Sequence, residues 1–358
     1  MKKTLLIPSY AIICLIACNA NASHLYTNAI SAHNIASFQH TIAQTAFASF
    51  DGPMSRAIIK HTKKQHNNED PNTTYGHAPM YGTMSIYGEY NDDGRSGGDN
   101  INARQTISNA WLNWQRIGND TKFDEISHLN SKYNIYMGGL TSGKTKLGRG
   151  HAAWGIYSGY LDGDTHSHAI DTDSQGGFFG IYNRYQNQKI NISTTINGGV
   201  VNNTTDTTFG TDETTNFWIG GLVNTTYNII MDNTFTLQPN IQFGYTWIKS
   251  ENYTSASGDI INNSAFNMFE LTPGISAIKH IGNNWFGEIG VKHVMIFATD
   301  GDITANNASL DSLTNHDYTE YGISLEKAAG PIAFRANIGR RDGSRSGWTG
   351  GLNFKYLF

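Results

Sequence analysis

Residues 138–145 match the G-x-x-x-x-G-K-T pattern of a nucleotide-binding loop letter for letter. In such a loop, backbone N–H groups surround the phosphates and the lysine reaches them, which requires a strand before the loop and a helix after it. Residues 146–150 are turn-like and precede another strand pattern rather than a helix. We therefore interpret this stretch as a glycine-rich turn between strands.

A second candidate is a group of side chains suited to a divalent cation. Histidine nitrogen and aspartate oxygen are common metal ligands. The group consists of His166 and His168 with Asp162, Asp164, Asp171 and Asp173. All of them fall in a long polar stretch, where such residues also serve solubility. We predict no metal and no cofactor here.

Acid–base chemistry is the third candidate, with His293, His316 and Asp317 as the available groups. No spacing singles out a nucleophile together with its base. We therefore predict that the protein is not an enzyme, and keep an enzyme that uses these groups as an alternative.

Composition points to a β-rich fold. The chain has 358 residues with 38 Gly and only 7 Pro, 12% aromatic and 15% charged residues, and a formal net charge of −4. So many aromatics and so few charges exclude a disordered chain, and the acidic balance argues against binding nucleic acid. After residue 22 no apolar run approaches the ~18 residues that a membrane helix needs.

The first residues have the pattern of an export signal. Lys2 and Lys3 precede an apolar stretch, and Ala20-Asn21-Ala22 is a small-x-small cleavage site. We predict a signal peptide over 1–22. An alternative is lipidation at Cys18, because residues 15–18 resemble a lipobox.

Residues 23–107 form an N-terminal segment of mixed pattern. Apolar residues recur at helical spacing over 28–64, with an interruption near Gly52-Pro53. Residues 65–79 have the polar, proline-containing composition of a linker, and 80–90 is a possible strand.

From residue 108 onward, aromatic and β-branched segments alternate with connections rich in Asn, Asp, Thr and Gly. In 235–248 the odd-numbered residues are apolar and nearly all even-numbered ones are polar, and 345–358 alternates in the same way from Trp348. A period of two places apolar and polar residues on opposite faces of a strand. The twelve segments are 108–117, 131–141, 151–161, 175–185, 188–200, 215–230, 235–248, 266–279, 284–297, 317–328, 331–341 and 345–358.

The connections also alternate between long and short. We predict long polar loops at 118–130, 162–174, 201–214, 249–265 and 298–316, and tight turns at 186–187, 231–234, 280–283 and 329–330. Long loops at one end and tight turns at the other are typical of a transmembrane β-barrel.

A soluble barrel or sandwich also alternates, but it points its apolar residues inward. Here the polar face carries charged residues that would be costly in a dry core and that a wet lumen can solvate or pair. The predicted lumen-facing charges are Glu270, Glu288, Lys292, Glu320, Glu326, Arg335, Arg341 and Lys355. We therefore predict an all-β fold, an antiparallel transmembrane β-barrel of about 12 strands preceded by a short helical N-terminal segment.

The C-terminal residues resemble the assembly signal of bacterial outer-membrane barrels. The chain ends in Phe358, with Tyr356, Phe354 and Leu352 at alternate positions before it. In that family assembly machinery reads this signal, and an unpaired terminal strand is an edge ready to pair with another strand.

Residues 108–358 more narrowly resemble the translocator barrel of autotransporters. The resemblance rests on 111–114 (WLNW), 133–140 (YNIYMGGL), 154–160 (WGIYSGY), 237–247 and 271–275 (LTPGI). It implies twelve strands, with a helix running through the lumen to an N-terminal passenger, and 28–64 is the candidate for that helix. A hairpin of 81–91 with 104–117 would raise the strand count to fourteen.

Two features bear on a passenger. The segment before the first strand is short and shows no repeat, so we expect any cargo to be tiny or missing. Asn67-Asn68 resembles the Asn-Asn cleavage point of some autotransporters, but its surroundings do not match, and we interpret it as linker.

The sequence thus predicts three parts: a signal peptide (1–22), an N-terminal segment (23–107) and an autotransporter-type outer-membrane barrel (108–358). We expect the barrel to anchor its N-terminal segment and to translocate or display it; a porin-like passive channel is the alternative. Expected partners are outer-membrane lipid, the barrel-assembly machinery and periplasmic chaperones, with no nucleic acid and a monomeric barrel. The expected location is the bacterial outer membrane, after export by a cleaved signal.

Overall fold

The computed structural model describes residues 27–50, 107–122, 129–167, 170–187, 189–232, 234–299, 303–309 and 317–358. The predicted signal peptide, linker and strand at 80–90 lie outside these residues, as do Cys18 and residues 51–64 of the predicted helix. One helix, α2 (Thr27–Phe50), precedes the strands. Within the described residues, no helix is long and apolar enough to cross a membrane.

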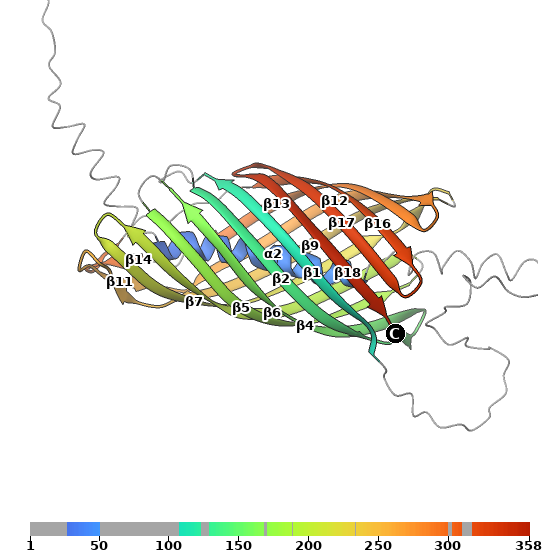
Figure 1. Cartoon of the computed structure of the whole chain (residues 1–358), viewed down its shortest axis with the longest axis horizontal. Helices are drawn as coiled ribbons and strands as arrows, with labels where there is room; N and C mark the ends of the chain where they lie inside the picture. Colours follow the sequence, from blue (N-terminus) through green and yellow to red (C-terminus); the bar gives the residue numbers. More distant parts are fainter. Residues whose placement is uncertain are drawn as a thin grey trace, which may run out of the picture.

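Twelve antiparallel strands close into a barrel (Figure 1). Sequential strands are neighbours, β9 pairs with β12, and β18 pairs with β1 to complete the cylinder. The strands are β1 (Ile107–Thr121), β2 (Leu129–Ser142), β4 (Gly150–His166), β5 (Ile170–Gln186), β6 (Ile190–Thr207), β7 (Gly210–Tyr227), β9 (Phe235–Ser250), β12 (Phe266–Gly282), β13 (Trp285–Thr299), β16 (Tyr318–Ala329), β17 (Ile332–Gly343) and β18 (Arg345–Leu357). All twelve predicted segments correspond to these strands, and the fold class is confirmed.

The alternation of side chains along each strand has the predicted sense. In β9, Ile241 and Phe243 are exposed on the outer surface, whereas Gln242 and Thr246 are buried inside. In β18, Leu352 and Phe354 point outward and Asn353 inward. Closure of the barrel gives the backbone N–H and C=O groups of every strand a hydrogen-bond partner. This is needed because lipid hydrocarbon cannot form hydrogen bonds with them.

The two ends of the barrel differ. At the end that we name the short-turn end, β12 joins β13 through Asn283 and Asn284, whose φ angles of 47° and 60° define a two-residue hairpin turn. The start of β1 and the end of β18 lie at this same end. The opposite end, which we name the long-hairpin end, carries the connections β4–β5, β6–β7, β9–β12 and β13–β16. In outer-membrane barrels the short turns face the periplasm.

The predicted long loops are wrong in part, because strand pairing continues through them. β4 extends to His166 and β5 begins at Ile170, inside the predicted loop 162–174. Only two residues join β6 to β7, inside the predicted loop 201–214. Thr, Asn and Asp on both faces remove the apolar alternation but not the backbone ladder, so these strands continue beyond the apolar band.

Short strands lie in four of the connections between the barrel strands: β2–β4, β7–β9, β9–β12 and β13–β16. β10 (Tyr253–Thr254), β11 (Ile260–Asn263), β14 (Ile303–Ala305) and β15 (Ala308–Ser309) form a separate four-stranded sheet at the long-hairpin end. β3 (Thr145–Leu147) pairs with β4, and β8 (Ile229–Ile230) pairs with β9.

Helix α2 lies inside the barrel (Figure 1). Its 24 residues span ~36 Å, which exceeds the ~30 Å hydrocarbon core of a bilayer. Ile35, Ala36 and Ile42 are at most 1% exposed. The predicted lumen helix is therefore present over Thr27–Phe50.

Candidate functional site: the helix-filled lumen

One wall of the lumen is apolar and holds the apolar face of the helix. Ile35, Phe38 and Ile42 recur at helical spacing and pack with inward-facing aromatics in a single buried cluster. Phe38 meets Tyr133 of β2 with 4.0 Å between ring centroids. At β7 the helix comes so close that a Cβ on Gly220 would lie 2.8 Å from Cγ of Gln39.

Inward-facing aromatic rings cover glycines on the neighbouring strands. A Cβ at Gly155 would overlap the ring of Tyr182, and one at Gly180 would overlap the ring of Tyr157. The phenol hydroxyls are also paired, since Trp111 Nε1 donates to the Tyr182 hydroxyl at 2.8 Å. At these glycines the aromatic rings occupy the space that a Cβ would otherwise fill.

Sequence reasoning missed this wall, because it assigned a wet lumen to the whole barrel. A signal was available in the sequence. In the first strands, several aromatic residues stand at the alternate positions that are otherwise polar and therefore face the lumen. Trp111, Tyr133, Tyr157, Tyr182 and Trp218 are each at most 4% exposed.

The opposite wall is polar, and Arg341 of β17 is its centre. Arg341 is 2% exposed. Its Nε donates to Glu320 Oε2 at 3.0 Å, and its terminal nitrogens donate to Ser37 Oγ (3.4 Å) and Thr41 Oγ1 (3.3 Å) of the helix. A fourth hydrogen bond, to Asn119 Oδ1, is 3.2 Å long. One guanidinium therefore joins two barrel strands to two successive turns of the helix.

A second polar contact joins the helix to β12. Nδ1 of His40 lies 2.8 Å from Oε2 of Glu270, and both side chains are almost fully buried. Gln44, one helical turn further on, contacts His40 and donates to Gln242 Oε1 at 3.2 Å. Breaking a buried pair by removing one partner is strongly destabilising, so these contacts fix the rotation and depth of the helix.

The remaining predicted lumen charges form pairs or are shielded on the inner face. Lys292 Nζ lies 2.9 Å from Glu320 Oε1 and donates to Gln44 Oε1 at 2.5 Å. Arg335 and Glu288 pair at 2.9 Å. Glu326 and Lys355 are buried at 7% and 9% exposure.

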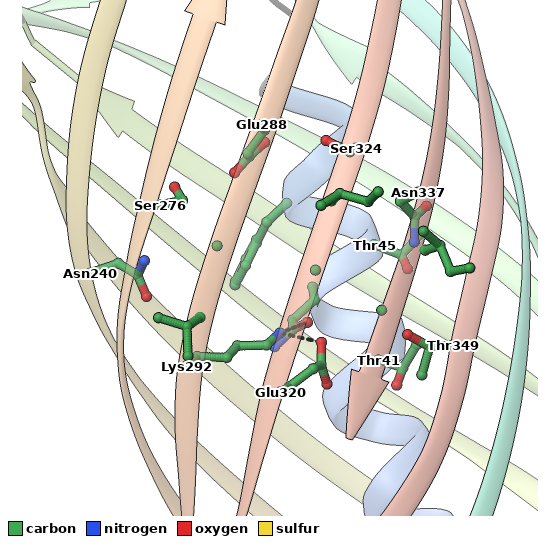
Figure 2. A pocket seen from close by; sticks show the side chains of 18 of the residues that line it. Thr41, Thr45, Asn240, Ser276, Glu288, Lys292, Glu320, Ser324, Asn337 and Thr349 are labelled. Carbon is green, nitrogen blue, oxygen red and sulfur yellow. Dashed lines mark hydrogen bonds and ion pairs between the residues drawn. The ribbon is translucent and has the colours of Figure 1, made fainter. Parts of the chain in front are cut away.

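A polar cavity of about 270 Å³ lies between this wall and the C-terminal half of the helix. Figure 2 shows Lys292 and Glu320 meeting beside the helix, with Thr41 and Thr45 on the helix side. The rest of its lining is mostly amides and hydroxyls, among them Asn113, Asn240, Ser276, Ser324, Asn337 and Thr349. Its charges are matched by partners, so the cavity suits water or a polar chain better than a single ion.

The other candidate sites do not assemble into chemistry. Gly138 and Gly139 lie within β2, and β3 and β4 follow the stretch in place of a helix. His166 pairs with Asp164 at 2.9 Å and with Asp171. Among the described residues, no three His, Cys, Asp or Glu side chains converge in a way that could hold a metal.

At the long-hairpin end, Nε2 of His293 lies 3.7 Å from Oδ2 of Asp317, and Nδ1 lies 3.0 Å from Thr319 Oγ1. Both His293 and Asp317 are nearly half exposed. His316 and His168 lie outside the described residues. The predicted C-terminal signal residues Leu352, Phe354, Tyr356 and Phe358 are all exposed on the outer surface.

Solved structures of similar fold come from autotransporters. The transport unit of AIDA-I from Escherichia coli is 15% identical with a TM-score of 0.61, over 73% of this chain and 93% of that one. The beta domain of the Bordetella autotransporter BrkA is 13% identical with a TM-score of 0.60, over 71% and 100%. The translocator domain of NalP from Neisseria meningitidis is 11% identical with a TM-score of 0.59, over 70% and 89%.

A comparison with curated proteins finds no match to this chain. Residues 107–349, more than half of the chain, match the family model described as autotransporter beta-domain. The closed twelve-stranded barrel, its apolar outer face and its helix-filled lumen agree with that match. The chain belongs to the autotransporter beta-domain family and is an outer-membrane barrel of this type.

Proposed function

We propose that the barrel anchors the chain in the outer membrane and holds its N-terminal helix so that residues before Thr27 are delivered to the outer surface. The observation that carries this proposal is the direction of the buried helix. Ser31, near its start, donates to Asn203 Oδ1 at 3.0 Å and accepts from Asn216 Nδ2 at 2.7 Å, close to the long β6–β7 hairpin. Phe47, near its end, packs on Leu222 towards the short-turn end.

Anchoring and display are favoured over a passive channel because the lumen is occupied. A porin needs a continuous aqueous path, whereas here both the apolar and the polar walls contact the helix. A polar cavity remains beside the helix. A conductance measurement on the intact chain therefore tests the porin-like alternative.

The proposed route to the membrane begins with export by a signal peptide over 1–22, cleaved before the segment 23–107 emerges. We propose that periplasmic chaperones and the barrel-assembly machinery then act on a monomer. Support comes from β18, which carries the outward row Leu352, Phe354, Tyr356 and Phe358 and pairs with β1 only when the barrel closes. Before closure β18 has a free edge that another strand can pair with.

We propose no catalytic role and no cofactor. The family is one of translocator barrels rather than enzymes. The charged residues of the lumen are arranged as helix-to-wall contacts and ion pairs, which explains them without a reaction.

The direction of the helix predicts where an inserted epitope is exposed. A short epitope between His24 and Leu25 should bind antibody on intact cells. The same epitope between Gly143 and Lys144, in a connection at the short-turn end, should bind only after the outer membrane is permeabilised. Antibody labelling followed by flow cytometry measures both. If intact cells expose the second epitope and hide the first, the proposed direction is wrong.

A further inference from the structure

The membrane-facing surface of β9–β18 has an apolar groove of about 480 Å³. This volume lies within the roughly 300–1,000 Å³ range of small-molecule sites. Its lining includes Leu237, Ile275, Ile289, Tyr321, Ile338 and Trp348.

The groove follows a row of inward-pointing small residues. Gly290, Gly322 and Gly339 are paired in register across β13, β16 and β17. At this row the outer surface is bare backbone. A ridge of outward side chains lies on each side, Val291, Tyr321 and Arg340 on one and Ile289, Ile323 and Ile338 on the other.

The groove descends through the membrane because the strands are tilted. At one end, Arg340 and Trp348 lie near the long-hairpin ends of β17 and β18; at the other, Leu237 lies near the start of β9 at the short-turn end. Five spacings of about 4.8 Å separate β18 from β9, which gives a length of roughly 24 Å along the barrel surface. With strands tilted by about 40°, its two ends differ in depth by roughly 15 Å, about half of the ~30 Å hydrocarbon core.

Arginine side chains lie at the outer end of the groove, and one of them is ion-paired with Asp342. The Arg340 guanidinium carbon lies 5.4 Å from the Trp348 ring centroid, and Asp342 accepts only its Nε hydrogen at 3.0 Å. Within the described part of the chain, its two terminal nitrogens make no hydrogen bond. Arg116 of β1 is exposed on the same face, opposite Gly350 in register. Arg340 and Arg116 therefore lie on β17 and β1, the two strands that flank the strand of Trp348. Tryptophan is enriched at the level of the lipid headgroups.

A second groove gives an internal comparison. It lies on the outer face of β18, β1, β2, β4 and β5, measures about 520 Å³ and is lined by residues such as Ala110, Leu112, Leu140 and Phe179, with no charged side chain. Apolar shape is thus common to both grooves, and charge distinguishes the first.

We propose that the β9–β18 groove binds one outer-leaflet lipid with a phosphate-bearing headgroup. Its phosphate accepts hydrogen bonds from Arg340 and Arg116, and an acyl chain lies along the bare glycine row. Guanidinium groups suit phosphate because they donate two parallel hydrogen bonds and stay charged at any physiological pH. Basic residues placed beside membrane-facing apolar surface are a known means of holding anionic headgroups.

The test uses the purified full chain in detergent, with phosphatidic acid and diacylglycerol of the same acyl chains as probes. Native mass spectrometry counts the lipids retained on each barrel. We expect phosphatidic acid to be retained in preference to diacylglycerol, and the preference to fall about tenfold in the double variant Arg116→Gln/Arg340→Gln. Ala277→Phe, which narrows the groove, should weaken retention of both lipids.

Matched controls come from the same barrel. Lys327 lies 4.8 Å from the Trp285 ring centroid near the opposite membrane border, and Ala110 lies in the uncharged groove. Lys327→Gln should preserve the preference, and Ala110→Phe should preserve retention at the first groove. Circular dichroism verifies that each variant is folded.

Equal retention of the two lipids by the unmodified protein would overturn the proposal. So would a loss in Lys327→Gln as large as in the double variant. An equal concentration of inorganic phosphate should leave phosphatidic acid bound. Complete displacement would show that free phosphate suffices, and would also overturn it.

Discussion

Deletion of residues 27–50 should raise the single-channel conductance of the barrel about tenfold, because the helix is what separates a twelve-stranded lumen from a water-filled pore. The helix contacts both lumen walls, and the cavity beside it measures only about 270 Å³. Planar-bilayer recording of the intact and deleted chains makes the comparison. Equally large conductance from the intact chain would support the porin-like alternative.

A single substitution should give an intermediate effect. Arg341→Gln removes the charge that holds Glu320 and two helix hydroxyls. Loss of one partner from a buried ion pair costs about 3–5 kcal/mol, and Lys292 still pairs with Glu320, so the low end applies. The recording should show transient openings on a closed baseline. Arg340→Gln, one residue away on the outer face, should leave the baseline unchanged.

Gly180→Ala should destabilise the barrel by about 1–3 kcal/mol, which is the usual cost of overpacking a close-packed site. The added Cβ would overlap the Tyr157 ring. That ring is held through its hydroxyl, which accepts a hydrogen bond from Asn197 Nδ2 at 2.8 Å and shares one with Thr195 Oγ1 at 3.0 Å. Urea unfolding in detergent, followed by tryptophan fluorescence, measures the loss.

Two further variants isolate the cause. Gly177→Ala lies on the same strand but faces outward, where the nearest atom to the new Cβ is 4.0 Å away, so we expect stability within about 0.5 kcal/mol of the unmodified protein. In a Tyr157→Ala background the cost of Gly180→Ala should largely vanish, as a double-mutant cycle shows. An unchanged cost in that background would mean that backbone strain, not the ring, explains the glycine.

The strands were predictable because alternation is local. The apolar odd-numbered residues of 235–248 predict the membrane-facing side of that strand, and this prediction needs no information about neighbouring strands. The ends of the strands were not predictable. Thr204, Thr205 and Asp206 are polar on both faces of β6, and yet they stay paired with β7. Pairing in water requires only a partner strand, and composition does not reveal one.

The lumen was predictable only in part. Alternation assigns Lys292, Glu320 and Arg341 to the inner face, but their contact depends on the register of three strands, which turns and bulges fix. The apolar wall depends on which side of the bore the helix touches. Inward rings such as Tyr157 match Ile35 and Phe38 only once the barrel is closed around them. No single segment contains that information.

The most direct measurement of the helix's position and direction is a thiol cross-link. With Cys14 and Cys18 replaced by Ser, the pair Ser31→Cys/Asn216→Cys joins side chains that hydrogen-bond at 2.7 Å across the helix–wall boundary. The control pair Ser31→Cys/Asn353→Cys combines the same helix position with a residue in the wall of the cavity near the short-turn end. A short bifunctional thiol reagent should link the first pair in intact cells and leave the second unlinked. Linking of the second pair alone would show that the helix lies in the lumen in the opposite direction, and linking of neither would show that it does not occupy the lumen.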